Sequence, residues 1–453
     1  MRSSNYLANP RNPTNGGLVD EVSGAFVANP AFTRPSSKEK GSLDYVAAKG
    51  HFKSSRIIKE SDCPARHLQE SQEKEFPMHS SDVRLPDDLL VAIKHVAALN
   101  SKKLCSFRRE QRHRLQTFAD RPILVSLQRR ICSLHGRPEA AKKLPCSYNY
   151  AFLCLMIDAM DWPDKKLSYN MFFGFNTSGC IDDSGVFRPI TPHEQPHAFK
   201  EAHDFIFSPS ECESWLYGLK RSLTAAGQRA QSENPKELSK LRKVEEATMQ
   251  EVDKELCSKE LSFNDVLERV RKGNVRVIPL FGIEQGDKVR PIDDCSKCGI
   301  NAATLTVETV SHPNAEFPAR VAKSLFETCS KSGVGMPRLG VAFDDCDAAY
   351  RLIPSRQPGN SIVAFWSPSK EKVVFFQVWG HSFGLVSAVL NFNRVPKIHV
   401  AFMRRFFASM MDHYVDDYIM VDRLDAKLPV HSGVFVTASF AHRDKVGTGK
   451  KWR

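Results

Sequence analysis

The sequence predicts an α+β protein, mainly helical in its first half and built from short strands and helices in its second. Apolar residues recur at helical spacing from Leu85 to about Trp162. A charged stretch punctuated by Leu and Val, from Pro235 to Lys272, is typical of one or two exposed helices. After Gly273 the pattern changes to short apolar runs separated by tight turns. We therefore expect a first hairpin directly after Gly273, and then the order strand, helix, strand, helix, hairpin in the remainder of the chain.

Changes in composition divide the chain into three parts. Residues 1–80 are rich in Ser, Asn, Pro, Lys and Glu without sustained apolar periodicity, which predicts a disordered leader. Residues 81–272 form the mainly helical region, in which we recognise no chemistry. The strand-containing remainder begins at residue 273.

The overall charge favours a polyanionic partner. The chain has 453 residues and a formal net charge of +12, and 42% of its residues are hydrophobic. Cationic surface gains affinity for nucleic acid by releasing phosphate counterions. The best apolar run, from Tyr150 through Met156, stops at Asp158 and is far shorter than the ~20 residues of a membrane-spanning helix. The first 14 residues are polar and contain two prolines, unlike a secretory signal. We therefore expect an intracellular protein of the nucleus or cytoplasm without a membrane partner.

The 12 cysteines show no pattern typical of disulfides or zinc sites. Cys295 and Cys298 form a C-x-x-C sequence, but no second pair follows at zinc-binding spacing. The cysteines are therefore predicted to be reduced thiols.

A β-hairpin is predicted directly after Gly273. Residues Val275–Ile283 alternate loosely between apolar and polar, Glu284–Asp287 supply turn residues, and Lys288–Ile292 form a basic return strand.

Paired aspartates occur five times, so only their context separates them. Asp87 and Asp88 follow a proline at a predicted helix start, where negative charge suits the helix dipole. Asp182 and Asp183 precede Ser-Gly, a turn sequence. The remaining pairs are Asp293–Asp294, Asp344–Asp345 and Asp416–Asp417.

Asp416 and Asp417 lie between two β-prone runs, Met410–Val415 and Tyr418–Val421, with no glycine or proline between them. A tight hairpin would bring both carboxylates to its end. Two adjacent like charges are costly unless a cation neutralises them, and Mg²⁺ prefers carboxylate oxygens. An ordinary exposed turn would more naturally use Asn-Gly or Asp-Gly.

A second acidic strand end lies 71 residues before Asp416. The apolar run Leu339–Phe343 leads into Asp344 and Asp345. Two-metal phosphoryl transfer needs acids from separate strands, holding two ions ~3.5–4 Å apart. One strand end and one hairpin turn can supply these acids.

Four segments in order resemble the motifs of reverse transcriptases of the retrotransposon type. Tyr414–Asp417 resembles their Y-x-D-D sequence, and Asp345–Pro354 resembles D-x-x-x-A-[FY]-x-x-[IV]-P. Phe383–Ala388 is similar to F-G-L-x-x-A, and Lys288–Asp293, with Asn301 beyond it, is similar to a strand of the fingers. The resemblance covers roughly residues 273–422.

The resemblance implies the right-hand polymerase fold, with fingers in residues 273–340 and palm in residues 341–453. The implied activity is RNA-directed DNA synthesis, in which deoxynucleoside triphosphates extend a primer on an RNA or DNA template. Asp345 and Asp416, with Asp417 beside them, would ligate two Mg²⁺ ions, for which Mn²⁺ could substitute. Asp345 rather than Asp344 takes the first role because Ala349, Tyr350 and Pro354 then fit the motif.

Four further residues acquire expected roles from the resemblance. Tyr350 would pack under the sugar and disfavour a 2′-hydroxyl; the alternative is an ordinary buried tyrosine. Lys288 and Arg290 could bind the triphosphate, Arg290 being favoured, although either could be a solvated strand residue. Gly384 would let template or nucleotide approach the backbone closely.

Several features depart from the family pattern. Ser382 and Val389 stand where prolines are expected, and Pro396 predicts a kink or restart in the helix after Gly384. Only 36 residues follow Asp417, so we expect the palm to be truncated before a thumb. Two alternatives therefore stay open: an inactive, nucleic-acid-binding relic of a retroelement, or an RNA-dependent RNA polymerase, against which Tyr350 argues.

Overall fold

The computed structural model describes residues 17–19, 26–28, 85–119, 121–134, 149–191, 207–273, 275–286, 288–313, 315–346, 348–356 and 361–426. The chain divides into two compact units, Met1–Pro86 and Asp87–Arg453. In the first unit, strands β1 (Gly17–Val19) and β2 (Phe26–Ala28) pair antiparallel. The rest of the predicted leader, residues 1–80, lies outside the described residues.

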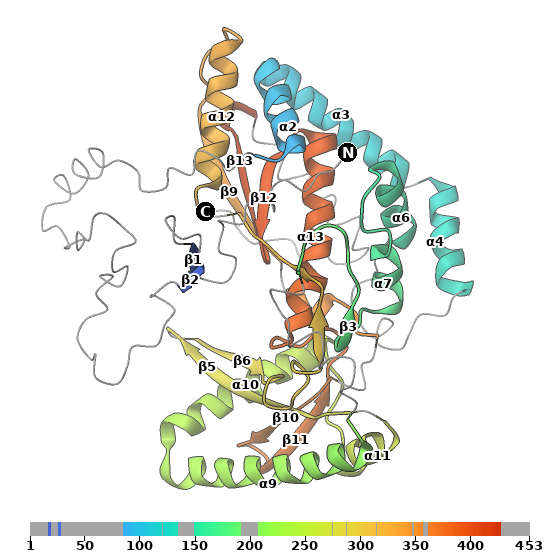
Figure 1. Cartoon of the computed structure of the whole chain (residues 1–453), viewed down its shortest axis with the longest axis vertical. Coiled ribbons are helices and arrows are strands. Elements are labelled where there is room, and N and C mark those ends of the chain that lie inside the picture. Colours follow the sequence, from blue (N-terminus) through green and yellow to red (C-terminus); the bar gives the residue numbers. More distant parts are fainter. Residues whose placement is uncertain are drawn as a thin grey trace, which may run out of the picture. The chain divides into compact units, whose positions relative to one another are not determined.

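The described part of the second unit is mixed α/β, as the sequence predicts (Figure 1). Its helices are α2 (Asp87–Ala98), α3 (Ser101–Ala119), α4 (Pro122–Leu134), α6 (Tyr150–Ala159), α7 (Leu167–Phe173), α9 (Pro209–Glu233), α10 (Pro235–Asp253), α11 (Phe263–Lys272), α12 (Phe317–Lys331) and α13 (Val386–Phe407). Its strands are β3 (Gly179–Ile181), β4 (Arg188–Pro189), β5 (Ile278–Gln285), β6 (Lys288–Asp293), β7 (Thr304–Thr306), β8 (Glu308–Thr309), β9 (Leu339–Asp345), β10 (Ile362–Ser367), β11 (Lys372–Gln377), β12 (Met410–Tyr414) and β13 (Asp417–Arg423). The short 3-10 helices η3 (Ala349–Leu352) and η5 (Leu424–Ala426) follow β9 and β13.

The helices α10 and α11 occupy the charged stretch for which the sequence predicts one or two helices. Asn234 caps α10, because its side-chain oxygen accepts a hydrogen bond from the Glu237 amide at 3.0 Å. Ser262 and Asp265 form a reciprocal capping box at the start of α11. These side chains satisfy backbone donors that have no partner within the helix, and so they define where each helix begins.

A four-stranded sheet in the order β11-β10-β5-β6 contains the predicted hairpin. In this hairpin β5 pairs antiparallel with β6, Gln285 lies opposite Lys288, and Gly286 has a φ of +58°. The structure adds the hairpin β10–β11, which the predicted element order lacks. All six residues of β10 are buried, and β10 lies parallel to β5 at the sheet centre. Helices α9, α10 and α11 pack against this sheet.

A three-stranded antiparallel sheet in the order β12-β13-β9 carries the predicted catalytic acids. Figure 1 shows α13 running beside β12. Phe402 and Phe407 of α13 share a buried core with Met411 of β12 and Met420 of β13. Helices α2 and α12 pack on each other and contact β12 and β13.

Helix α13 is continuous from Val386 to Phe407, with Pro396 inside it. Of the predicted kink or restart at Pro396, the restart is therefore wrong, and the kink stays a prediction. Residues on both sides of the proline are buried, and this packing outweighs the loss of one backbone hydrogen bond.

Helices α2 and α3 are attached to the end of the three-stranded sheet by arginines. The guanidinium of Arg423, at the end of β13, donates to the Leu99 carbonyl at 2.7 Å, between α2 and α3. Arg404 of α13 pairs with Asp88 of α2 at 3.2 Å. Within the described residues, no helix is long and apolar enough to cross a membrane.

Candidate active site

The register of the three-stranded sheet brings the two acidic segments together. Asp345, the last residue of β9, lies directly opposite Asp417, the first residue of β13. Tyr414 also pairs with Asp417, so Val415 and Asp416 form a two-residue turn between β12 and β13. The Cys346 amide donates a hydrogen bond to the Asp416 carbonyl at 3.0 Å. The three predicted metal-binding acids are therefore brought to one end of the sheet by the backbone.

The backbone is strained on both sides of this junction. Val415 has a φ of +53° and Ala348 a φ of +54°. Val415 is the only β-branched residue among the non-glycine residues with positive φ in the described part of the chain. A β-branched residue in this conformation is a genuine outlier, and such strain costs of order 1–3 kcal/mol. Strained residues of this kind cluster at functional sites.

His312 supports the strained turn from outside the sheet. Its Nδ1 accepts a hydrogen bond from the Val415 amide at 3.4 Å, and its ring lies 4.9 Å from the Tyr414 ring. Burial, with the Lys397 charge, lowers the pKa of His312 to about 4. The imidazole is therefore neutral at pH 7, which leaves Nδ1 able to accept.

The three predicted metal-binding acids differ in how far their side chains are exposed and described. Asp416 is half-buried and Asp417 is exposed, whereas the side chain of Asp345 lies outside the described residues. No group of three or more His, Cys, Asp or Glu that could hold a metal is found among the described residues, a set that lacks this side chain. The donors that the sequence places here are all carboxylates, which suit Mg²⁺ and Mn²⁺.

Tyr350 lies where the two large hydrophobic cores meet, and its side chain contacts both. Its ring makes edge-on contacts with Phe383 at 5.5 Å and Phe392 at 5.4 Å. Burial, followed by the charge of Asp416, raises the pKa of Tyr350 to about 12. The structure thus brings Tyr350 within electrostatic reach of one predicted metal ligand.

A buried arginine directly after Tyr350, Arg351, joins this segment to the four-stranded sheet and to α10. Arg351 pairs with Asp293 at the end of β6 at 2.8 Å and with Glu251 of α10 at 2.9 Å. Asp293 also accepts a hydrogen bond from the Phe383 amide at 2.7 Å. Burial alone would lower the pKa of Arg351, but Asp293 and Glu251 outweigh it and raise that pKa.

Removing Arg351 is expected to destabilise the fold strongly. In Arg351→Met, Asp293 becomes a buried charge without its partner, which costs about 3–5 kcal/mol of unfolding free energy. The matched control is Arg271→Gln, which breaks the exposed pair between Arg271 and Glu213 and should change the unfolding free energy far less, because solvent screens exposed ion pairs. Urea unfolding of both variants measures the difference. Equal losses would contradict a structural role for the buried pair.

Gly384 is held against the chain's own backbone. A Cβ at this position would lie 1.8 Å from the Asp293 carbonyl oxygen, so only glycine fits. Asn301 stabilises the same segment, donating to the Gly384 carbonyl at 2.8 Å and accepting from the Val386 amide at 3.0 Å. The close approach that the structure contains is therefore to Asp293, and an approach of template or nucleotide to Gly384 stays a prediction.

Lys288 and Arg290 are exposed on β6. Neither forms an ion pair with any other described residue. At ~3.4 Å per residue, Arg290 lies ~10 Å and Lys288 ~17 Å along the strand from Asp293. The opposite face of the hairpin packs on α10, where a Cβ at Gly282 would meet Val244 at 3.0 Å. The structure thus leaves both cations available, without bringing them into contact with the acids.

Cys295 and Cys298 are both buried in the core that includes residues of the four-stranded sheet. Burial raises the pKa of both thiols, that of Cys298 to about 11. Both are free thiols in the structure, and the reduced state of the 12 cysteines stays a prediction.

Three histidines, of which His381 and His413 are buried and His312 is half-buried, predict a loss of stability in mild acid. Burial lowers the pKa of His312, His381 and His413 to about 4, from an ordinary value of 6.5. Between these values the unfolded chain binds protons that the folded chain does not, so stability falls as pH falls from about 6.5 to about 4. One such histidine contributes up to about 3 kcal/mol. Thermal unfolding across this range should show a smaller drop for His381→Gln than for the parent, and an unchanged drop would contradict this assignment.

Of the residues that matter to this geometry, sequence reasoning missed three. His312 has no motif of its own, and Glu251 lies in the region where no chemistry was recognised. Arg351 was part of the motif, but its buried pairing depends on contacts across 58 residues to Asp293. No model of a known protein family and no curated protein matches the chain. The assignment of a function therefore depends on the motifs and on the geometry described above.

Proposed function

We propose that the chain is a reverse-transcriptase-like nucleotidyltransferase that extends a primer with deoxynucleotides on an RNA template. The observation that carries the proposal is the register of β9 on β13, with Asp345 opposite Asp417 and Asp416 in the adjoining turn. Repulsion between carboxylates brought together from two strands costs free energy unless cations neutralise them. Two-metal phosphoryl transfer requires a set of carboxylates from separate strands. The strain at Val415 and Ala348 supports the same location.

Asp345, Asp416 and Asp417 are the residues that would hold two Mg²⁺ or Mn²⁺ ions. When bound, such ions neutralise phosphate charge and orient the attacking and leaving oxygens. The protein's own part is to fix the carboxylates. The hydrogen bond from Cys346 to Asp416 and the support of Val415 by His312 hold the turn against the end of β9.

Nucleotide selection is proposed for Tyr350. Phe383 and Phe392 restrict its ring on two sides, so it can act as a fixed wall beneath the sugar. With a pKa of about 12 the phenol stays neutral beside Asp416, which avoids adding negative charge to an acidic site. A fixed aromatic wall excludes a 2′-hydroxyl by its volume. Lys288 and Arg290 supply cations on the fingers-like hairpin for the triphosphate.

The direct test is extension of a labelled DNA primer on an RNA template, with deoxynucleotides or ribonucleotides, in Mg²⁺ or in excess chelator. The proposal predicts extension only with the metal, and preferentially with deoxynucleotides. Preference for ribonucleotides would instead favour an RNA polymerase.

A further inference from the structure

Positive charge is concentrated in one short part of the chain, outside the region that resembles a polymerase. Residues 101–134, which include α3 and α4, contain nine Lys and Arg and two Asp and Glu, a net charge of +7. The whole chain has a net charge of +12. Thirty-four residues therefore account for more than half of the excess, far more than their share of the length.

The charge lies mainly on the outward side of α3. Lys102 and Arg109, seven residues apart, fall on one line of the helix, and Lys103 and Arg114, eleven apart, fall on a second. All four are exposed, as is His113. We call these five residues the α3 basic face. It extends for ~18 Å along the helix, at ~1.5 Å per residue. Within α3 its one acidic neighbour is Glu110, which pairs with Arg114.

The inward side of α3 fixes the direction of this face. Leu104 is fully buried, and so is Arg108, whose guanidinium pairs with Asp422 of β13 at 2.7 Å. Arg108 also donates to the Phe407 carbonyl at 3.1 Å and the Ala408 carbonyl at 3.2 Å, at the end of α13. A buried charge with several partners holds one orientation. The α3 basic face is therefore held outward on a rigid support, not on a loose segment.

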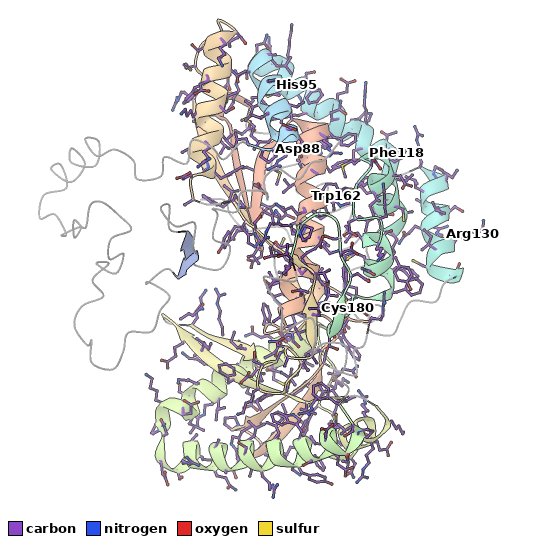
Figure 2. All side chains as sticks on the ribbon, in the orientation of Figure 1. Asp88, His95, Phe118, Arg130, Trp162 and Cys180 are labelled. Carbon is purple, nitrogen blue, oxygen red and sulfur yellow. The ribbon has the colours of Figure 1, made fainter. Side chains whose placement is uncertain are left out.

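The neighbouring helix adds cations without acids. Helix α4 carries exposed Arg129 and Arg130, and it contains no Asp or Glu. Figure 2 shows Arg130 on the side of α4 that is turned away from α6.

Several cations of α3 have no acidic partner among the described residues. No ion pair with a described residue is formed by Lys102, Lys103 or Arg112, so their charge is not offset within the described structure.

We propose that the α3 basic face binds the phosphodiester backbone of a nucleic acid. Rows of cations on a rigid helix suit a polyanion with regularly spaced charges, and their affinity arises from counterion release. The other exposed positions described on α3 hold Ser106, Glu110 and Thr117, so α3 presents no large apolar side chain to enter a lipid layer. This binding surface lies outside the proposed active site and does not depend on the proposed activity.

The test compares two variants that each lose three positive charges from exposed helix positions. The first is Lys102→Gln/Lys103→Gln/Arg109→Gln on the α3 basic face. The matched control is Arg221→Gln/Arg229→Gln/Arg242→Gln on α9 and α10, where the three arginines are also exposed. Fluorescence anisotropy with labelled RNA and DNA duplexes of one sequence measures affinity over a range of salt, without nucleotides. Thermal unfolding verifies that both variants fold like the parent.

The α3 variant should bind about tenfold or more weakly than the parent at ~0.15 M salt, and the slope of log affinity against log salt should fall by about 2–3. The control should stay near the parent, and Lys102→Arg/Lys103→Arg/Arg109→Lys should retain binding. Comparison of the RNA and DNA arms identifies the preferred nucleic acid. Equal weakening in both triple variants, or no weakening, would overturn the proposal. Binding of the parent and of the α3 variant to anionic phospholipid vesicles is measured in the same way. If the α3 variant loses binding to the vesicles but binds the RNA and DNA duplexes like the parent, the proposal is also overturned.

Discussion

Replacing Asp345 with Asn is expected to lower the rate of nucleotide addition by about 10³-fold or more. The change keeps the size of the side chain but removes the charge that would bind the metal, and a group acting directly on developing charge contributes on this scale. Binding of primer and template should stay near that of the parent. Single-turnover extension at saturating template measures the chemical step separately from binding.

The matched control is Asp344→Asn, one residue earlier on β9. Successive strand residues lie on opposite faces of a sheet, and Asp344 is opposite Tyr418 whereas Asp345 is opposite Asp417. We expect Asp344→Asn to keep extension within a few-fold of the parent. A loss of extension in Asp344→Asn with normal extension in Asp345→Asn would show that the register of the motif is assigned one residue too late.

Replacing Tyr350 with Val is expected to raise the use of ribonucleotides relative to deoxynucleotides by about 10- to 200-fold. Steric discrimination by one or two heavy atoms is worth about 1–3 kcal/mol, which corresponds to that range. The smaller side chain leaves room for a 2′-hydroxyl, while Phe383 and Phe392, which contact the Tyr350 ring, are unchanged. The ratio of kcat/KM for matched nucleotide pairs measures the change.

Tyr350→Phe separates this role from an ordinary structural one. It keeps the ring that would exclude the 2′-hydroxyl and removes only the phenolic oxygen, so sugar selectivity should stay near that of the parent. If Tyr350→Val loses stability but keeps its selectivity, Tyr350 is a core residue and the proposed role is wrong. Unfolding by urea distinguishes these outcomes.

Local signals in the sequence were sufficient for the two hairpins. Gly286 and its neighbours define the turn between β5 and β6, and the β-prone runs around Asp416 define β12 and β13. Both depend on residues close in sequence, where alternation and turn chemistry act directly. The hairpin β10–β11 was missed because its first strand, Ile362–Ser367, is buried throughout and so shows no alternation.

Contacts between distant segments could not be predicted from one sequence. Arg108 pairs with Asp422 across 314 residues, and Arg423 reaches Leu99 across 324. A surface arginine and a buried one have the same local sequence signal, because burial depends on what packs against them. The attachment of α2 and α3 to the three-stranded sheet therefore became visible only in three dimensions.

In the candidate site, too, the features with a local sequence signal could be predicted and those that depend on distant contacts could not. The acids could be selected from their strand contexts, and the structure then gave the register that brings Asp345 opposite Asp417. His312 could not be selected, because it lies in an irregular segment 103 residues before the turn that it supports. The strain at Val415 was also hidden, since φ depends on the turn that the two strands impose.

The measurement that tests the central claim most directly is Mg²⁺-dependent primer extension by the parent chain beside Asp416→Ala, on one RNA template. The account predicts that the parent incorporates deoxynucleotides, whereas Asp416→Ala binds the primer and template equally well and incorporates none. Equal template binding with no incorporation by either protein would contradict an active polymerase and would favour a nucleic-acid-binding relic.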